Sequence, residues 1–159
     1  MSTRTAVVIT ASNRASRGEY SDLSGAALVK GLSALGYQVQ GPHIVQDDVA
    51  AISEQLTLAL ASHTRLIVTT GGTGVSPTDV TPEATAPFIE KLIPGFTEAL
   101  RAYSREKVAT SDLTRGLAGT HGKSLIINLP GSQGAVIDGL VIIERLAGHI
   151  LDQLEGKDH

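Results

Sequence analysis

A glycine-rich turn followed by a carboxylate is the part of the chain best suited to chemistry. The segment reads Thr69-Thr-Gly-Gly-Thr-Gly-Val-Ser-Pro-Thr-Asp79 and continues as Val-Thr-Pro-Glu83. Its three glycines allow positive φ angles and a close approach of a ligand to the main chain. Successive N–H groups in such a turn form a nest that binds anions. The pattern therefore predicts a site for a small molecule that carries a phosphate.

Other glycine-rich loops fit this segment less well. No Lys-Ser or Lys-Thr pair follows, so it is not a Walker A loop, and Pro77 stands where the third glycine of a dinucleotide loop belongs. A nicotinamide-dependent reductase is a further hypothesis, and the missing glycine argues against it. An ordinary tight turn between a strand and a helix is the alternative without a ligand. The acid at Asp79 and the helix start that follows favour the phosphate site.

Two acids in separate segments could hold a cation beside this phosphate. Asp79 would repel the ligand unless a cation lay between them, and Mg²⁺ is commonly held by one or two carboxylates together with substrate phosphates. In the pair Asp47-Asp48, we expect Asp48 to cap the helix that begins at Val49, which leaves Asp47 free to face the ligand. The alternative for Asp79 is a hydrogen bond within its own loop. We therefore predict a Mg²⁺ site formed by Asp47 and Asp79.

The composition excludes several classes of function. The 159 residues carry a formal charge of −3 and include two Phe, three Tyr, no Trp and no Cys. Nucleic acid is not an expected partner, because basic residues and stacking platforms are scarce. Disulfides, zinc sites with cysteine ligands and thiolate catalysis are excluded, because each of them requires cysteine. The apolar part of the N-terminus is shorter than a signal-peptide core, and no stretch approaches the length of a membrane span, which predicts a cytoplasmic protein without a membrane partner.

Short apolar runs alternate with segments of helical periodicity along the whole chain. This alternation predicts one α/β domain over residues 1–159 with a mostly parallel sheet. Thr81 is expected to cap the third helix, with Pro82 at its first position. The expected strands are 6–10, 37–45 with a break at Gly41-Pro42, 66–70 and 124–129. The expected helices are 24–36, 49–62, one that starts at 81, 96–107 and 136–154.

The residues with chemical potential follow the ends of the predicted strands. In a parallel sheet the carboxyl ends of the strands meet at one edge, where ligands bind. We therefore expect four segments to converge on one site: Ser12-Asn13-Arg14, Asp47-Asp48, Gly71–Gly74 and Pro130-Gly131-Ser132.

The same segments resemble the molybdenum cofactor biosynthesis family, which contains the molybdopterin adenylyltransferases and relatives that bind molybdopterin. The matching stretches occur in the family's order and cover nearly the whole chain. They are Ser12–Gly25, Val45–Asp48, Thr70–Gly74, Asp79–Ala84, Pro94–Phe96, Thr114-Arg115 and Asn128–Ser132.

The resemblance implies a three-layer α/β/α fold and a homotrimer, with contacts to other proteins of cofactor biosynthesis. It implies transfer of AMP from ATP to the terminal phosphate of molybdopterin, with release of pyrophosphate. Asp47 and Asp79 match the two functional acids of the family. The segments that match its molybdopterin pocket supply Thr70, Gly71, Gly72, Thr73, Gly74, Pro130, Gly131 and Ser132.

The chain departs from the family pattern at four positions. Asn13 stands where Asp is frequent, Gln46 and Gln133 where Pro is frequent, and His121 where Arg or Lys is common. None of these changes removes an acid assigned to the metal. His121 in place of a permanent cation predicts weaker attraction of phosphate on its side of the pocket. A protein that binds molybdopterin without catalysis is the alternative function.

Overall fold

The central feature of the fold is a six-stranded sheet in the order β2-β1-β3-β6-β5-β4. Strands β2, β1, β3 and β6 run parallel, whereas β5 is antiparallel to β6 and β4 is antiparallel to β5. The computed structural model describes residues 3–157. In chain order the elements are β1 Thr5–Ala11, α1 Asn13–Ser16, α2 Leu23–Ala34, β2 Gln38–Val45, α3 Val49–Ala61, β3 Leu66–Thr70, α4 Thr81–Thr85, the 3₁₀ turn η1 Ala86–Phe88, β4 Lys91–Leu92, α5 Pro94–Arg105, the 3₁₀ turn η2 Ala109–Leu113, β5 Ala118–His121, β6 Ser124–Leu129 and α6 Gln133–Leu154.

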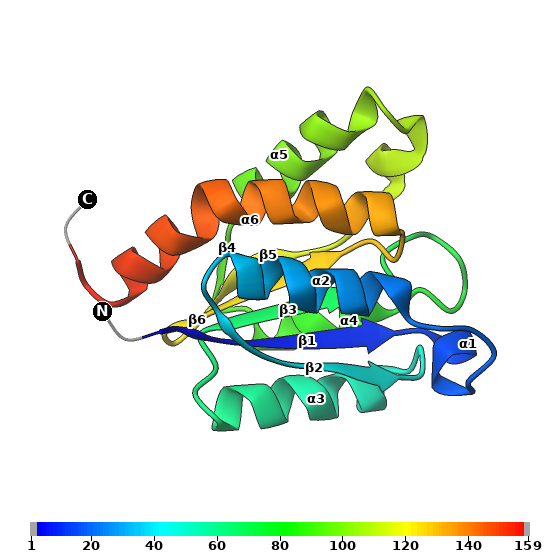
Figure 1. The fold of residues 1–159 in the computed structure, drawn as a ribbon, viewed down its shortest axis with the longest axis horizontal. Helices are drawn as coiled ribbons and strands as arrows, with labels where there is room; N and C mark the ends of the chain where they lie inside the picture. Colours follow the sequence, from blue (N-terminus) through cyan, green and yellow to red (C-terminus); the bar gives the residue numbers. More distant parts are fainter. Residues whose placement is uncertain (1–2, 158–159) are drawn as a thin grey trace.

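Helices cover both faces of this sheet. Successive residues of a strand point to opposite faces. Accordingly Ala6 and Val8 of β1 pack into a cluster with α2, α5 and α6, whereas Val7 and Ile9 pack against α3 and α4. Figure 1 shows α2 and α6 on one side of the strands and α3 on the other. This arrangement confirms the predicted three-layer α/β/α fold with a mostly parallel sheet.

Most elements lie where the sequence pattern predicts them, and the differences have local causes. Strand β2 is not broken at Gly41-Pro42, because an irregularity in its register with β1 absorbs the extra residue. Helix α5 begins at Pro94, since proline suits the first turn of a helix. The antiparallel strands β4 and β5 were not predicted, because β4 has only two residues and β5 reads Ala-Gly-Thr-His without an apolar run.

A cluster of ion pairs at the amino edge of the sheet ties the end of α6 to β1 and β3. The Glu155 carboxylate lies 2.8 Å from Lys157 Nζ, 2.6 Å from Arg65 and 3.3 Å from Arg4. Hydrogen bonds from these three cations lower the pKa of Glu155 to about 2.

Within residues 3–157, no helix combines the length and the hydropathy that a membrane span requires.

Candidate functional site

The four segments predicted to converge do meet at the carboxyl edge of the sheet. The Asn13 amide donates to Asp47 Oδ2 at 3.0 Å, and the Asp47 amide donates to Asn13 Oδ1 at 2.9 Å. The Gly71 amide donates to the Leu129 carbonyl at 3.0 Å, which joins the glycine turn to the end of β6. The Asn13 side chain acts only as an acceptor in this pair, so the aspartate frequent in the family could make the same bond.

The glycine turn has a backbone that only glycine adopts readily. Gly71 and Gly72 have φ angles of +96° and +69°. A Cβ atom would lie 2.3 Å from the Ala11 carbonyl oxygen at Gly71, and 2.4 Å from Thr81 Oγ1 at Gly72. Among the hydrogen bonds of residues 3–157, the amides at positions 72, 73 and 74 donate none. Three successive N–H groups therefore have no acceptor within the described residues, which is a condition of the predicted nest.

Buried side chains hold this turn from behind. Thr81 Oγ1 donates to the Gly71 carbonyl at 2.9 Å, and the Thr81 amide donates to the Gly72 carbonyl at 3.1 Å. The prediction that Thr81 caps α4 is therefore wrong, because Val80 occupies the cap position and the threonine hydroxyl bonds to the turn instead. Asn128 donates to Thr85 Oγ1 at 3.1 Å, and Thr85 Oγ1 donates to the Thr81 carbonyl at 2.8 Å.

Arg115 holds the outer side of the same turn, a role that the sequence analysis did not assign. Its guanidinium donates to the carbonyls of Gly74 at 2.8 Å and Asp79 at 3.0 Å. Both of its terminal nitrogens also donate to Glu83 at 3.0 Å. The Arg115 amide donates to the Thr73 carbonyl at 2.8 Å. Only the family match at Thr114-Arg115 indicated this residue, because some forty positions separate it from the turn.

Asp79 combines the two roles that the sequence left open. Its Oδ2 accepts hydrogen bonds from the Ser76 amide at 3.0 Å and from Ser76 Oγ at 2.9 Å, which shape the loop. The residue also lines the cavities on both sides of the glycine turn. The loop contacts engage one carboxylate oxygen, so the group remains able to contribute to a cation site.

Asp47 lies on the smaller of these cavities and in the field of the second acid. Its neighbour Asp48 accepts from the Ala51 amide at 2.9 Å and caps α3, as predicted. Burial raises the pKa of Asp47, the charge of Asp79 adds to this rise, and the hydrogen bond from the Asn13 amide opposes it. A cation near both carboxylates would offset this repulsion.

Two cavities flank the glycine turn and share part of their lining. One has a volume of about 310 Å³ and the other about 640 Å³, and Gly72, Asp79 and Gly131 border both. The smaller cavity is also bordered by Asp47, Thr70 and Gly71. The remaining predicted binding residues, Thr73, Gly74, Pro130 and Ser132, border the larger one.

The loop before α6 completes the junction of the cavities. Thr70 Oγ1 donates to the Pro130 carbonyl at 2.8 Å, and Ser24 Oγ donates to the Gly131 carbonyl at 2.7 Å. Ser132 Oγ accepts from the Ala135 amide at 3.1 Å and caps the helix. The positive end of the α6 dipole thus lies at the site, where it favours a bound anion.

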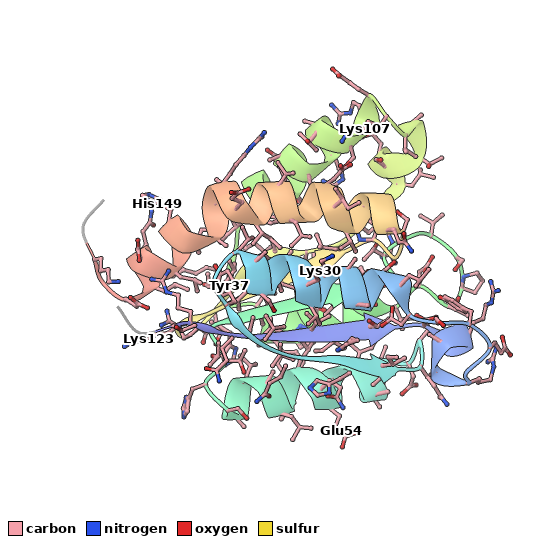
Figure 2. The ribbon with its side chains drawn as sticks, in the orientation of Figure 1. Lys30, Tyr37, Glu54, Lys107, Lys123 and His149 are labelled. Atoms are coloured by element: carbon pink, nitrogen blue, oxygen red, sulfur yellow. The ribbon has the colours of Figure 1, made fainter. Side chains whose placement is uncertain are left out.

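His121 lies away from this edge, so the prediction that it weakens phosphate attraction is wrong. It closes β5 at the hairpin with β6, and its Nδ1 lies 2.8 Å from the Phe88 carbonyl oxygen. Lys123 of the same hairpin lies at the end of the sheet opposite α1 (Figure 2). Neither cavity of the carboxyl edge is bordered by His121.

The residues at the carboxyl edge suit a hard cation only with help from a ligand. Within residues 3–157 no group of three or more His, Cys, Asp or Glu side chains could hold a metal by itself. Asp47 and Asp79 supply carboxylate oxygens, which Mg²⁺ prefers as ligands. In protein sites with one or two carboxylates, substrate phosphates commonly complete the coordination of Mg²⁺. The donor set therefore fits a Mg²⁺ ion that arrives with a phosphate ligand.

Fold and site together define an α/β protein with two adjoining cavities at the carboxyl edge of its sheet. The family model described as "Probable molybdopterin binding domain" matches residues 7–148. The chain therefore belongs to this family of molybdenum cofactor biosynthesis, and the resemblance seen in the sequence is confirmed.

Three relatives illustrate the match, each covered over most of its own length. The molybdopterin adenylyltransferase of Helicobacter pylori strain J99 is 39% identical over 153 residues, which cover 94% of this chain and 87% of that protein. The structure of the molybdopterin biosynthesis Mog protein from Mycobacterium ulcerans has a TM-score of 0.90 at 41% identity, covering 96% and 99% of the two chains. The tungsten cofactor synthesizing protein MoaB from Pyrococcus furiosus gives 0.89 at 36% identity, with 97% and 98% covered.

Proposed function

We propose that this chain is a molybdopterin adenylyltransferase, which transfers AMP from ATP to the terminal phosphate of molybdopterin and releases pyrophosphate. The observation that carries the proposal is the pair of cavities that meet at Gly72, Asp79 and Gly131. A transfer between two phosphorylated substrates needs two pockets whose phosphate ends touch. The name of the Helicobacter pylori relative, which matches over almost the whole chain, supports the same reaction.

The reaction is an in-line displacement at the α-phosphorus of ATP. A terminal phosphate oxygen of molybdopterin forms a new bond to this phosphorus, and the bond to the bridging oxygen of the pyrophosphate breaks. The attacking phosphate is already ionised at neutral pH, so no side chain has to remove a proton from it. The work left to the protein is positioning and charge stabilisation, which the free amides at positions 72 to 74 and the amino end of α6 provide.

The two acids give this site its cation requirement. Asp47 and Asp79 would hold Mg²⁺, which when bound neutralises charge on the phosphates of ATP. In the protein itself, Asp79 is held by Ser76 and by the Arg115 contact to its carbonyl. Asp47 is held by its reciprocal hydrogen bonds with Asn13. Both carboxylates are thus positioned by the loops before any ligand binds.

The test is incubation of the purified chain with molybdopterin and Mg-ATP, followed by detection of adenylylated pterin and of pyrophosphate. We expect the two products in equal amounts, with no AMP transfer when Mg²⁺ is chelated. Folded protein that binds molybdopterin tightly but forms no product at any pH would refute the enzyme and support the binding protein.

The remaining features of the proposal rest on the family resemblance and on the substrates. We propose a homotrimer, which analytical ultracentrifugation would test, and a cytoplasmic location, where ATP is available as the donor. Contacts with other proteins of cofactor biosynthesis belong to the same proposal, since the product has to be passed on for metal insertion.

A further inference from the structure

A nearly buried carboxylate in the larger cavity has no part in the phosphate chemistry described above. Asp138 lies on α6, and 9% of its side chain is exposed. Ser104 Oγ donates to Asp138 Oδ2 at 2.8 Å, and Lys107 Nζ lies 2.7 Å from Asp138 Oδ1. All three residues border the larger cavity. A buried charge needs such partners, and a ligand in the cavity could be a further one.

The carboxylate lies at the right place to recognise the far end of a ligand. Ser132 begins α6 at the phosphate turn, and Asp138 follows six residues later on the same cavity wall. At 1.5 Å per residue this separation is about 9 Å along the helix. Three fused six-membered rings span a comparable length. Leu100, Leu113 and Ile137 add apolar side chains to the lining of the same cavity.

The two bonds that Asp138 makes leave it able to accept more. An ionised carboxylate has about four acceptor sites, and Ser104 and Lys107 use two of them. Lys107 lies just beyond the end of α5, on the side of the molecule away from α3 (Figure 2), and 55% of its side chain is exposed. Its ammonium also lies 4.2 Å from the centre of the Tyr103 ring. A flexible and exposed ammonium can move aside for a ligand while Ser104 keeps the carboxylate in place.

Hydrogen-bond chemistry selects the ligand that this carboxylate fits. The 2-amino-4-oxopyrimidine ring of a pterin presents two adjacent donors, the 2-amino group and N3–H. The equivalent edge of adenine presents an amino donor beside an acceptor nitrogen, which a carboxylate repels. Paired donors can bind a carboxylate with two parallel hydrogen bonds, as arginine does.

From this geometry we infer that Asp138 recognises the 2-amino and N3–H donors of the pterin, and that the larger cavity takes the pterin. The inference rests on the proposed function and adds a specificity-determining residue to it. Ser104 orients the carboxylate, and Lys107 is the counter-ion that the pterin displaces. Adenine is then left to the smaller cavity.

A matched ligand pair tests this inference without any mutation. The probes are 6-hydroxymethylpterin monophosphate and its lumazine counterpart, in which a 2-oxo group replaces the 2-amino group. We expect the pterin to bind about 10- to 100-fold more tightly in a fluorescence titration, the effect of losing a hydrogen bond to a charged group. Equal affinities for the two probes would overturn the inference.

Variants then assign this preference to the carboxylate. In Asp138→Asn the ratio of the two affinities should fall to about one, while the affinity for ATP stays at the wild-type value. In Lys107→Met, which keeps the apolar stem, the preference for the pterin should persist. A preference lost in Lys107→Met but kept in Asp138→Asn would overturn the inference. AMP transfer to molybdopterin by the wild type, measured separately, decides the proposed function whatever these ratios are.

Discussion

Gly71→Ala is expected to destabilise the protein by about 2–5 kcal/mol, a large part of the 5–15 kcal/mol typical of a domain. Gly71 has a φ of +96°, and a side chain in the left-handed region costs about 1–2 kcal/mol. Its Cβ would also lie 2.3 Å from the Ala11 carbonyl oxygen. That oxygen belongs to a central strand and cannot move alone, so overpacking adds about 1–3 kcal/mol.

Gly36→Ala provides a control that separates these two costs. Gly36 has a φ of +98°, nearly the same as Gly71, but a Cβ there would have nothing within 4 Å. This variant should therefore lose only about 1–2 kcal/mol, the backbone part of the cost. The difference between the two variants measures how tightly the glycine turn is packed on β1.

Urea unfolding, monitored by circular dichroism, gives the free energy of unfolding of each variant. The two curves are fitted with the same dependence of this free energy on urea concentration. At temperatures where Gly71→Ala stays folded, AMP transfer should still be strongly reduced, because the amides at positions 72 to 74 must shift with the turn. The reasoning is refuted if Gly71→Ala is no less stable than Gly36→Ala and transfers AMP at the wild-type rate.

The remaining predictions concern the support of the site and the ion pairs at the other edge. Arg115→Lys should lower kcat/KM about tenfold with little loss of Tm, because one ammonium cannot replace the guanidinium that donates to the carbonyls of Gly74 and Asp79. Unchanged kinetics would show that the glycine turn does not need the guanidinium. Glu155→Gln should be less stable than the wild type by its full amount above pH 4.5, and this difference should shrink as the pH falls toward 2. The reason is that the pKa of Glu155 is lowered to about 2 in the folded chain, so the wild type loses the ion pairs in that range. Thermal melts at several pH values measure this, and a constant difference down to pH 2 would contradict the ion-pair assignment.

Local chemistry was enough to predict a large part of the fold and the junction of the cavities. Asp48 caps α3 and Asp47 faces a cavity because a helix start has room for one capping side chain. The glycine turn could be recognised because Asp79 and a helix start follow its three glycines. The alternation of strands and helices then placed both features on one edge of a parallel sheet.

Contacts between distant segments could not be read from the sequence. Arg115 and Asp138 look like ordinary surface residues until the fold brings them to the turn and to the larger cavity. Thr81 followed the local rule for a helix cap, but the buried carbonyl of Gly71 offered its hydroxyl a better partner. His121 was expected at the site because the family pattern commonly has Arg or Lys there, and nothing in the sequence showed that β5 and β6 form an antiparallel hairpin.

The rate of AMP transfer in Asp47→Asn compared with Asp48→Asn tests the central claim most directly. The two acids are adjacent, but Asp47 borders the smaller cavity and Asp48 caps α3. Asparagine caps a helix as well as aspartate does, so Asp48→Asn should keep near wild-type kcat/KM. Asp47→Asn should lose about 100-fold or more, a loss comparable to that of one preorganised charge-stabilising group, while remaining folded. Equal activity in the two variants would contradict the account.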